Sequence, residues 1–218
     1  MKEILAVLSI IILVGCAANS SIKASSNLEN NYMLGEHIKN SILVGTKNVP
    51  LNEGDWVVIS THYSPAENTG RIMLGLIFED SLAAITIIKT NITKSDEMTR
   101  LANHPCKLRG GVYVIIKSKD EYTPECYMVA SVSSNFMKEQ VNPVRKGFQF
   151  VEKEFEADIP KTYIFASHFI AEGSDYLLVI RYWDSFGVHF GVDGGSIFPY
   201  ASRAEWWHPK IVEAFRKR

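Results

Sequence analysis

The sequence lacks an excess of charge of either sign. Its 218 residues include 23 Lys and Arg against 24 Asp and Glu, which gives a formal net charge of −1 at pH 7. A surface that binds nucleic acid needs clustered Lys and Arg to meet the phosphates, and the sequence has neither a basic excess nor an acidic block. We therefore expect no nucleic-acid partner.

Motifs that carry catalysis or metal binding are also missing. No His-Glu-x-x-His, Gly-x-Ser-x-Gly or Cys-x-x-Cys pattern occurs, and these are local signatures of zinc proteases, serine hydrolases and many thiol or metal sites. From the sequence we therefore assign no catalytic residue, no metal site and no cofactor.

The histidines are scattered, although a catalytic group could be assembled from them in space. The candidates are His62, His168 and His189, on or near expected strands, with Asp184, Ser185, Asp193 and Ser196 close to His189 in the sequence. A Ser-His-Asp triad is defined by geometry and not by spacing, so this set carries little information. A hydrolase remains an alternative that the sequence does not favour.

Long apolar segments are absent as well, apart from one short run. Ile4 to Val14 carries no charge, and as a helix it would reach about 16 Å, roughly half of a bilayer core of about 30 Å. The run is therefore too short to span a membrane. Its length is typical of the apolar region of a secretory signal peptide, and Lys2 supplies the preceding positive charge.

Leu13-Val14-Gly15-Cys16 ends this run and resembles the lipobox of bacterial lipoproteins. The resemblance covers residues 1–18 and implies that residues 1–15 are removed and that Cys16 carries the lipid that attaches the protein to a membrane. Because Ala17 follows in place of Asp, it implies the periplasmic face of the outer membrane, or the outer face of the cell membrane in a Gram-positive organism. The alternative is an ordinary signal peptide with an incidental Cys.

Two cysteines remain beyond the anchor, Cys106 and Cys126. An even number in an exported chain favours a disulfide between them over two free thiols or a metal site. Residues 16–34 comprise the lipidated Cys and a segment rich in Ser and Asn, which is typical of a flexible tether. The folded part is then expected to be a single domain over residues 35–218.

Most of this domain is expected to be strand. Seven segments are rich in β-branched and aromatic residues and are separated by short polar or Gly-containing turns: residues 55–63, 71–79, 82–90, 111–118, 126–134, 162–170 and 175–183. Several connections are too short for a crossover, so neighbouring strands must be antiparallel. The sequence predicts a curved sheet or a closed barrel of seven or eight strands.

Two helices are expected to pack on the sheet, which makes the fold class α+β. Residues 142–157 carry one apolar stripe, with Pro143 at the first helical position. The second helix is expected to begin at the capping-box pattern Ser202-Arg203-Ala204-Glu205. Pro209 inside it predicts a kink, or a new start at His208.

Gly54-Asp55-Trp56, at the start of the first long strand, resembles the Gly-x-Trp of lipocalins. The resemblance implies an eight-stranded barrel with an apolar cavity whose floor is closed by Trp56. The helix expected between strands departs from the lipocalin order, and a Trp that simply packs in a core explains the same residues. We favour the packed core.

Aromatic residues gather near the C-terminus at Phe198-Pro199-Tyr200 and Trp206-Trp207-His208-Pro209. Tyr200, Trp206, Trp207 and His208 are candidates for a binding surface, since clustered aromatic rings stack on sugars or lie at a membrane surface. A helix packing on a sheet explains them more simply, and only one of the two adjacent Trp residues can then point straight at the core. Residues 192–196, with Asp193 and two Gly, could cradle a phosphate or a metal ion but fit a turn better.

The combination of a Gly-x-Trp, seven or eight strands, a Cys pair and a C-terminal helix with Trp is similar to exported bacterial proteins of unassigned function, which implies no particular activity. The leading hypothesis is a non-enzymatic lipoprotein whose domain binds a protein partner or a small apolar ligand. The first alternative is a lipocalin-like carrier and the second is a hydrolase. A carrier requires an apolar cavity of several hundred Å³.

Overall fold

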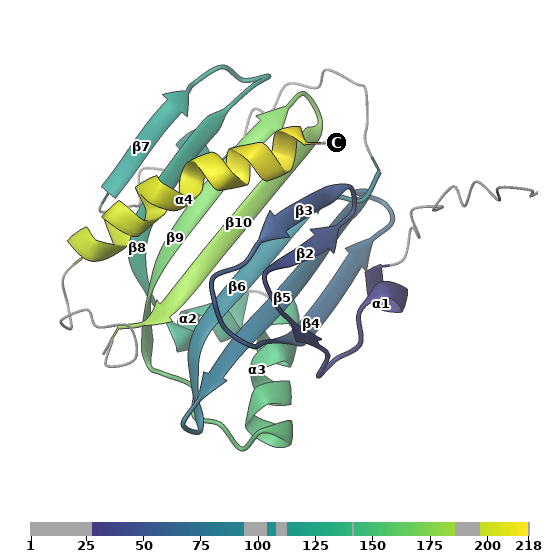
Figure 1. Cartoon of the computed structure of the whole chain (residues 1–218), viewed down its shortest axis with the longest axis vertical. Coiled ribbons are helices and arrows are strands. Elements are labelled where there is room, and N and C mark those ends of the chain that lie inside the picture. The colour runs from purple at the N-terminus through teal and green to yellow at the C-terminus, as the bar shows by residue number, and fades with distance from the viewer. Residues whose placement is uncertain (1–27, 94–103, 108–112, 141, 186–196, 218) are drawn as a thin grey trace, which may run out of the picture.

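The computed structural model describes residues 28–93, 104–107, 113–140, 142–185 and 197–217 (Figure 1). An antiparallel sheet of eight strands forms the centre, in the order β1-β4-β5-β6-β10-β9-β8-β7. Its strands are β1 (His37–Ile38), β4 (Trp56–Ser64), β5 (Thr69–Phe78), β6 (Ser81–Asn91), β7 (Tyr113–Ser118), β8 (Glu125–Ser133), β9 (Thr162–Glu172) and β10 (Asp175–Asp184). The expected α+β fold is confirmed, and all seven predicted strands are present.

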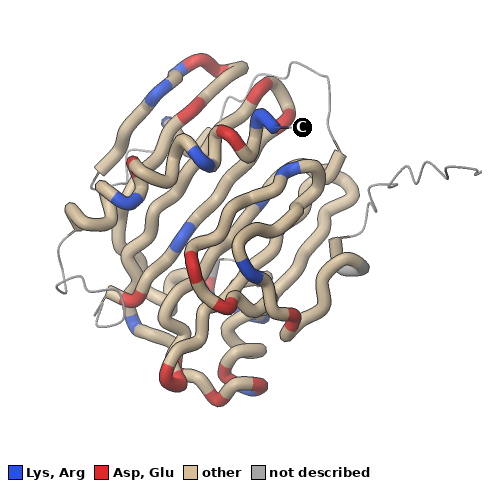
Figure 2. The backbone as a smooth tube through the Cα atoms, in the orientation of Figure 1, with Lys and Arg blue, Asp and Glu red and all other residues tan. Residues whose placement is uncertain are grey.

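The sheet is open. Its edge strands, β1 and β7, lie at opposite ends of the strand order, and within the described residues no ladder joins them. The barrel that the sequence left possible, and that a lipocalin would have, is therefore not observed. Figure 2 shows Lys and Arg interspersed with Asp and Glu, without a large area of one sign in this view.

A hairpin of strands β2 (Ser41–Val44) and β3 (Lys47–Pro50) packs in front of the sheet, and the sequence analysis missed it. Both strands are short, and buried positions alternate with less buried ones, with the charged Lys47 among the buried residues. Gly45 occupies the turn with φ of 61°, a conformation that favours glycine. This Gly follows Ile42-Leu43-Val44, so that the segment resembles a lipobox by chance.

Helix α4 (Phe198–Arg216) crosses the same face of the sheet (Figure 1). It begins four residues before the expected Ser202, because Pro199 in its first turn needs no hydrogen-bond partner. It also continues through Pro209, so the predicted new start at His208 is wrong. Burial of Trp207, Ile211 and Phe215 contributes about 1.5–3 kcal/mol each and exceeds the cost of about 3 kcal/mol for an interior proline.

The opposite face carries α2 (Ser134–Gln140) and α3 (Asn142–Glu154). The predicted stripe of α3 is confirmed, since Val144, Phe148 and Val151 are buried against the sheet and Phe155 is partly buried beside them. The short α2 was not predicted. Its start is marked by the Ser133 hydroxyl, which accepts a hydrogen bond from the Phe136 amide at 3.2 Å.

The described chain starts with α1 (Leu28–Asn31), inside the segment expected to be a tether, and Leu28 is buried in the core on the α4 side. The remaining element is the short 3-10 helix η1 (Pro105–Lys107), which carries one end of the predicted disulfide between Cys106 and Cys126. Within the described residues, no helix combines the length and the hydropathy needed to span a bilayer.

Candidate functional site

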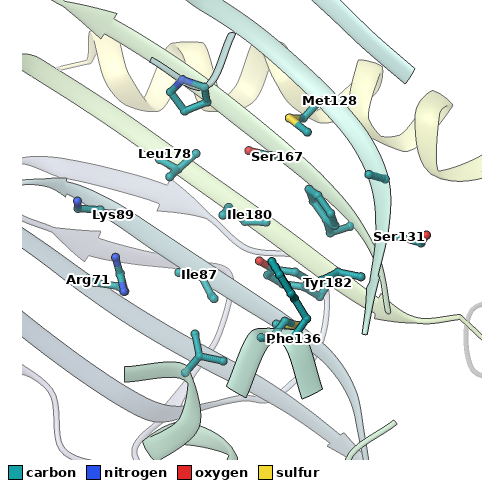
Figure 3. A pocket seen from close by; sticks show the side chains of 16 residues that line it. Arg71, Ile87, Lys89, Met128, Ser131, Phe136, Ser167, Leu178, Ile180 and Tyr182 are labelled. Atoms are coloured by element: carbon teal, nitrogen blue, oxygen red, sulfur yellow. The ribbon is translucent and has the colours of Figure 1, made fainter. Parts of the chain in front are cut away.

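A cavity of about 470 Å³ opens on the sheet face that carries α2 and α3 (Figure 3). Its wall is built from cross-strand rows, because residues directly opposite each other on paired strands point to the same face. One row joins β6, β10, β9 and β8, and a second joins β10, β9 and β8. The first consists of Ile87, Ile180, Ser167 and Met128, and the second of Tyr182, Phe165 and Ala130.

The face is hollow here because two wall residues are small. Ser167 lies opposite Ile180 and Met128 on the two neighbouring strands, and Ala130 lies opposite Phe165. The larger side chains extend further from the sheet than the two small ones. The helices do not fill the space: among the residues that the structure describes, α2 and α3 contribute only Phe136, Met137 and Val144 to its lining, and η1 contributes Pro105. The result is a partly open apolar cleft.

Tyr182 is the largest polar side chain in the wall, and it brings no charge. It is 9 % exposed, and burial raises the pKa of its hydroxyl, so the phenol stays neutral at physiological pH. Away from Arg71 and Lys89, the described lining of the cavity is therefore mainly apolar and uncharged.

Among the described residues that line the cavity, the charged ones lie at one end. Arg71 on β5 and Lys89 on β6 are direct cross-strand partners and lie side by side at this end (Figure 3). Both also line a second, smaller cavity of about 250 Å³, whose other residues are polar apart from one proline: His62, Ser64, Glu67, Thr69 and Pro143. An apolar and a polar cavity thus meet at two cations.

No family model, curated protein or solved structure matches the chain. Within the described residues, no cluster of His, Cys, Asp and Glu is arranged to hold a metal ion. The chemistry of the cavity therefore has to be derived from its own residues.

The predicted binding residue Trp56 does not line this site and lies on the other face of the sheet. It is 1 % exposed in the core on the α4 side, where its indole nitrogen donates to the Asn52 carbonyl at 2.9 Å. Trp56 thus packs in the core, as the sequence analysis favoured.

The aromatic candidates of α4 divide in the way expected for a helix on a sheet. Tyr200 is buried against Trp183, and Trp207 is 9 % exposed, whereas Trp206 is 61 % exposed with the Lys210 ammonium 3.1 Å from its ring centroid. None of these side chains lines either of the cavities described above.

His208, also a candidate, belongs to a buried array between α4 and the sheet. Its Nδ1 lies 3.4 Å from Nδ1 of His168, and its Nε2 lies 3.2 Å from Oε1 of Glu125. The Tyr127 ring stacks on the His168 ring and lies tilted against the His208 ring, 4.8 Å away between centroids. Burial lowers the pKa of His208, and the Glu125 carboxylate opposes this by raising it.

Arg181 lies beside this array and is 1 % exposed. Its guanidinium carbon is 4.0 Å from the Trp207 ring centroid, and its Nη2 donates to the Pro50 carbonyl at 2.8 Å. Burial lowers its pKa to about 9, which leaves it charged at neutral pH. The polar groups under α4 therefore hold the helix and the hairpin to the sheet.

The proposed meeting of His62 with His168 is not observed. His62 lines the polar cavity on the α3 side, whereas His168 contacts His208 on the α4 side, so these two do not converge. His189, Asp193 and Ser196 lie outside the described residues, so the triad and the Gly-rich turn at 192–196 cannot be placed.

The sequence analysis missed Arg71, Lys89 and Ser167. A signal was present: Arg71 and Lys89 are cations inside strands that are otherwise apolar, and strands of this kind are covered on both faces. Strand β8 alternates Met128, Ala130 and Val132 toward the cavity, but nothing in this pattern indicates that the helices leave the space above it unfilled.

Proposed function

We propose that this protein is a lipoprotein of the bacterial envelope, anchored through Cys16, whose domain binds a small apolar ligand between the sheet and helices α2 and α3. The observation that carries the proposal is the cavity of about 470 Å³ with an apolar wall. Ligand sites are usually clefts of about 300–1,000 Å³ lined mainly by apolar side chains with a few polar groups.

The size of the cleft distinguishes it from ordinary packing. Interiors of folded domains are close-packed, and voids larger than a water molecule are few. An apolar wall that stays open to water loses the stabilisation of about 25 cal/mol per Å² that burial would bring. An apolar ligand that covers the exposed Phe136 and the half-buried Ile180 and Phe165 recovers it, which supplies the driving force for binding.

This proposal favours a carrier or sensor of a small ligand over a module that binds only a protein. It does not rest on the Gly-x-Trp resemblance, since Trp56 packs on the other side of the sheet. The hydrolase alternative gains no support from the array of His168, His208 and Glu125, because those side chains lie under α4 and line neither cavity.

The test is photo-crosslinking of the full-length chain in membranes with a photoactivatable fatty acid, followed by mapping of the labelled peptides. We expect saturable labelling of β8, β9 and β10 that excess unlabelled fatty acid suppresses. Ser167→Phe should reduce the apparent affinity at least tenfold, because the larger ring fills the hollow beside Ile180.

The matched control is Leu43→Phe, which enlarges a strand residue that is 53 % exposed on β2, away from the cavity. The fatty acid should label this variant with the same apparent affinity as the wild type. Labelling that does not saturate, or that Ser167→Phe leaves unchanged while the variant remains folded, would overturn the proposal.

A further inference from the structure

The apolar cavity and its polar neighbour share two residues, Arg71 and Lys89, and both cavities lie on the same face of the sheet. The register places His62, Arg71 and Lys89 directly opposite one another on β4, β5 and β6. The same cross-strand row continues from Lys89 to Leu178 on β10, which is already in the apolar wall. Polarity therefore changes from cationic to apolar along one continuous row.

The pairing of the two cations is itself unfavourable. Like charges directly opposite each other on neighbouring strands destabilise a sheet. Within the described residues, no carboxylate forms an ion pair with Arg71, and Lys89 has only Glu67, at 3.8 Å and with a side chain that is 64 % exposed. An exposed pair of this kind contributes little. The site therefore has positive charge that a bound anion would balance.

We propose that the two cavities form one site for a single-chain amphiphile with an anionic head group, such as a carboxylate or a phosphate. The chain lies along Ile87, Ile180 and Ser167 in the apolar cavity, and the head group lies between Arg71 and Lys89 at its polar end. Arg71 offers a planar fork of donors that matches either oxyanion, and Lys89 adds a compact positive charge.

The polar cavity adds further hydrogen-bonding groups around this head group. Ser64, Thr69 and His62 line it. The Thr69 hydroxyl already donates to Glu67 at 3.2 Å, which holds that carboxylate beside Thr69 at the rim. A neutral amphiphile would bury the same chain but bring no anion to Arg71 and leave Lys89 with only the exposed carboxylate of Glu67, so the head group should set the specificity.

This inference rests on the proposed function, and the experiment separates the two. Dodecanoate, dodecyl phosphate and dodecanol share one chain and differ in the head group. Each competes with the photoactivatable fatty acid for the full-length chain, below the concentration at which it forms micelles. We expect each anion to compete at least tenfold better than dodecanol.

The variant Arg71→Met with Lys89→Met should abolish this preference while dodecanol still competes, because the methionines keep an apolar stem at each position. It should unfold no more easily than the wild type, since it removes a like-charge pair. The matched control is Lys119→Met with Lys146→Met. It removes two exposed cations, one from the loop between β7 and β8 and one from α3, and should keep the preference for anions.

The outcomes are distinct. If none of the three compounds competes saturably, the apolar site itself is refuted. If dodecanol competes as well as the anions, or if the Arg71 and Lys89 variant keeps the preference, the cavity stands and the anionic head group is refuted.

Discussion

At the scale of single residues, the unusual feature is the number of ionisable groups buried on the α4 side of the sheet. Lys47 on the hairpin and Asp175 on β10 form an ion pair in which each side chain is 2 % exposed. Such a pair contributes little net stability, but removing one partner would strand the other charge. It therefore fixes where the hairpin β2–β3 sits, which packing of small apolar residues alone would specify less well.

His168 makes folding sensitive to acid. Burial, and secondly the charges of Arg181 and His208, lower its pKa well below the usual value, and burial also lowers the pKa of His208. The other groups facing this pair are Glu125, Tyr127 and Lys117 from strands β7 and β8. Both histidines therefore take up protons at a lower pH in the folded state than in the unfolded chain, where they do so near pH 6.5, and the difference is larger for His168.

The unfolded state then binds more protons than the folded state below about pH 6.5, so the free energy of unfolding must fall as the pH drops. We expect a loss of up to about 1.4 kcal/mol per pH unit for each histidine that stays neutral, between pH 6.5 and pH 5. Urea unfolding followed by tryptophan fluorescence measures it. His168→Phe should flatten the slope.

His37→Gln serves as the control for this prediction, because His37 is an exposed side chain at the sheet edge, paired with Asp55. It should leave the slope unchanged. A wild-type free energy of unfolding that stays constant over the same interval would contradict the argument.

At the scale of elements, the disulfide between Cys106 and Cys126 is the strongest constraint on the β7–β8 edge of the sheet. It joins η1 to β8 across 20 residues, and β7 is an edge strand supported on one side only. Closing a loop of this length is worth about 3 kcal/mol in the chain-entropy model.

Replacing both residues with alanine should therefore lower the free energy of unfolding by about 3 kcal/mol and speed amide exchange in β7 and β8 before the central strands. Urea unfolding and hydrogen-exchange mass spectrometry measure the two effects. A reductant should destabilise the wild type and leave the Cys106→Ala, Cys126→Ala variant unchanged. If the oxidised wild type and this variant had the same free energy of unfolding, the disulfide would not stabilise the fold.

The elements differ in how far the sequence could predict them. Strands β5, β6, β9 and β10 are long and combine β-branched, aromatic and other apolar residues, so local preference and tertiary structure agree. The start of α4 was misplaced because Ser202 and Glu205 form a capping pattern inside a helix that Pro199 had already allowed to begin. Short β2 and β3 depend on packing against the sheet for most of their stability, which no local pattern records.

The candidate site was predictable only in its chemistry. A sequence can indicate that Arg71 and Lys89 are cations in apolar strands, but their pairing depends on the register of β5 and β6. The hollow depends on Ala130 and Ser167 lying next to larger residues, and on where α2 and α3 end. These are relations between segments far apart in the chain, so periodicity within one segment could not reveal them.

At the scale of the whole molecule, the two faces of the sheet differ in how completely they are packed. The face under α4 and the hairpin is filled by a core that includes Trp56, Trp183 and Ile211. The face under α2 and α3 is filled only in part and holds the cavity. Stability resides mainly on one side, which leaves the other free to bind a ligand without unfolding the domain.

The proposed location in the envelope depends on Cys16. A single acyl chain binds a membrane only marginally, whereas two or more chains on one residue anchor a protein stably, at about 0.8 kcal/mol per buried CH₂. If the lipobox resemblance holds, cells grown with an alkyne fatty acid should yield labelled protein in the membrane fraction. Cys16→Ser removes the only thiol that the lipobox offers and should abolish the label.

The Cys106→Ala, Cys126→Ala variant keeps Cys16 and should remain labelled, which separates loss of the anchor from loss of stability. Label retained by Cys16→Ser would show that attachment, if any, occurs elsewhere, and the envelope location proposed here would lose its basis.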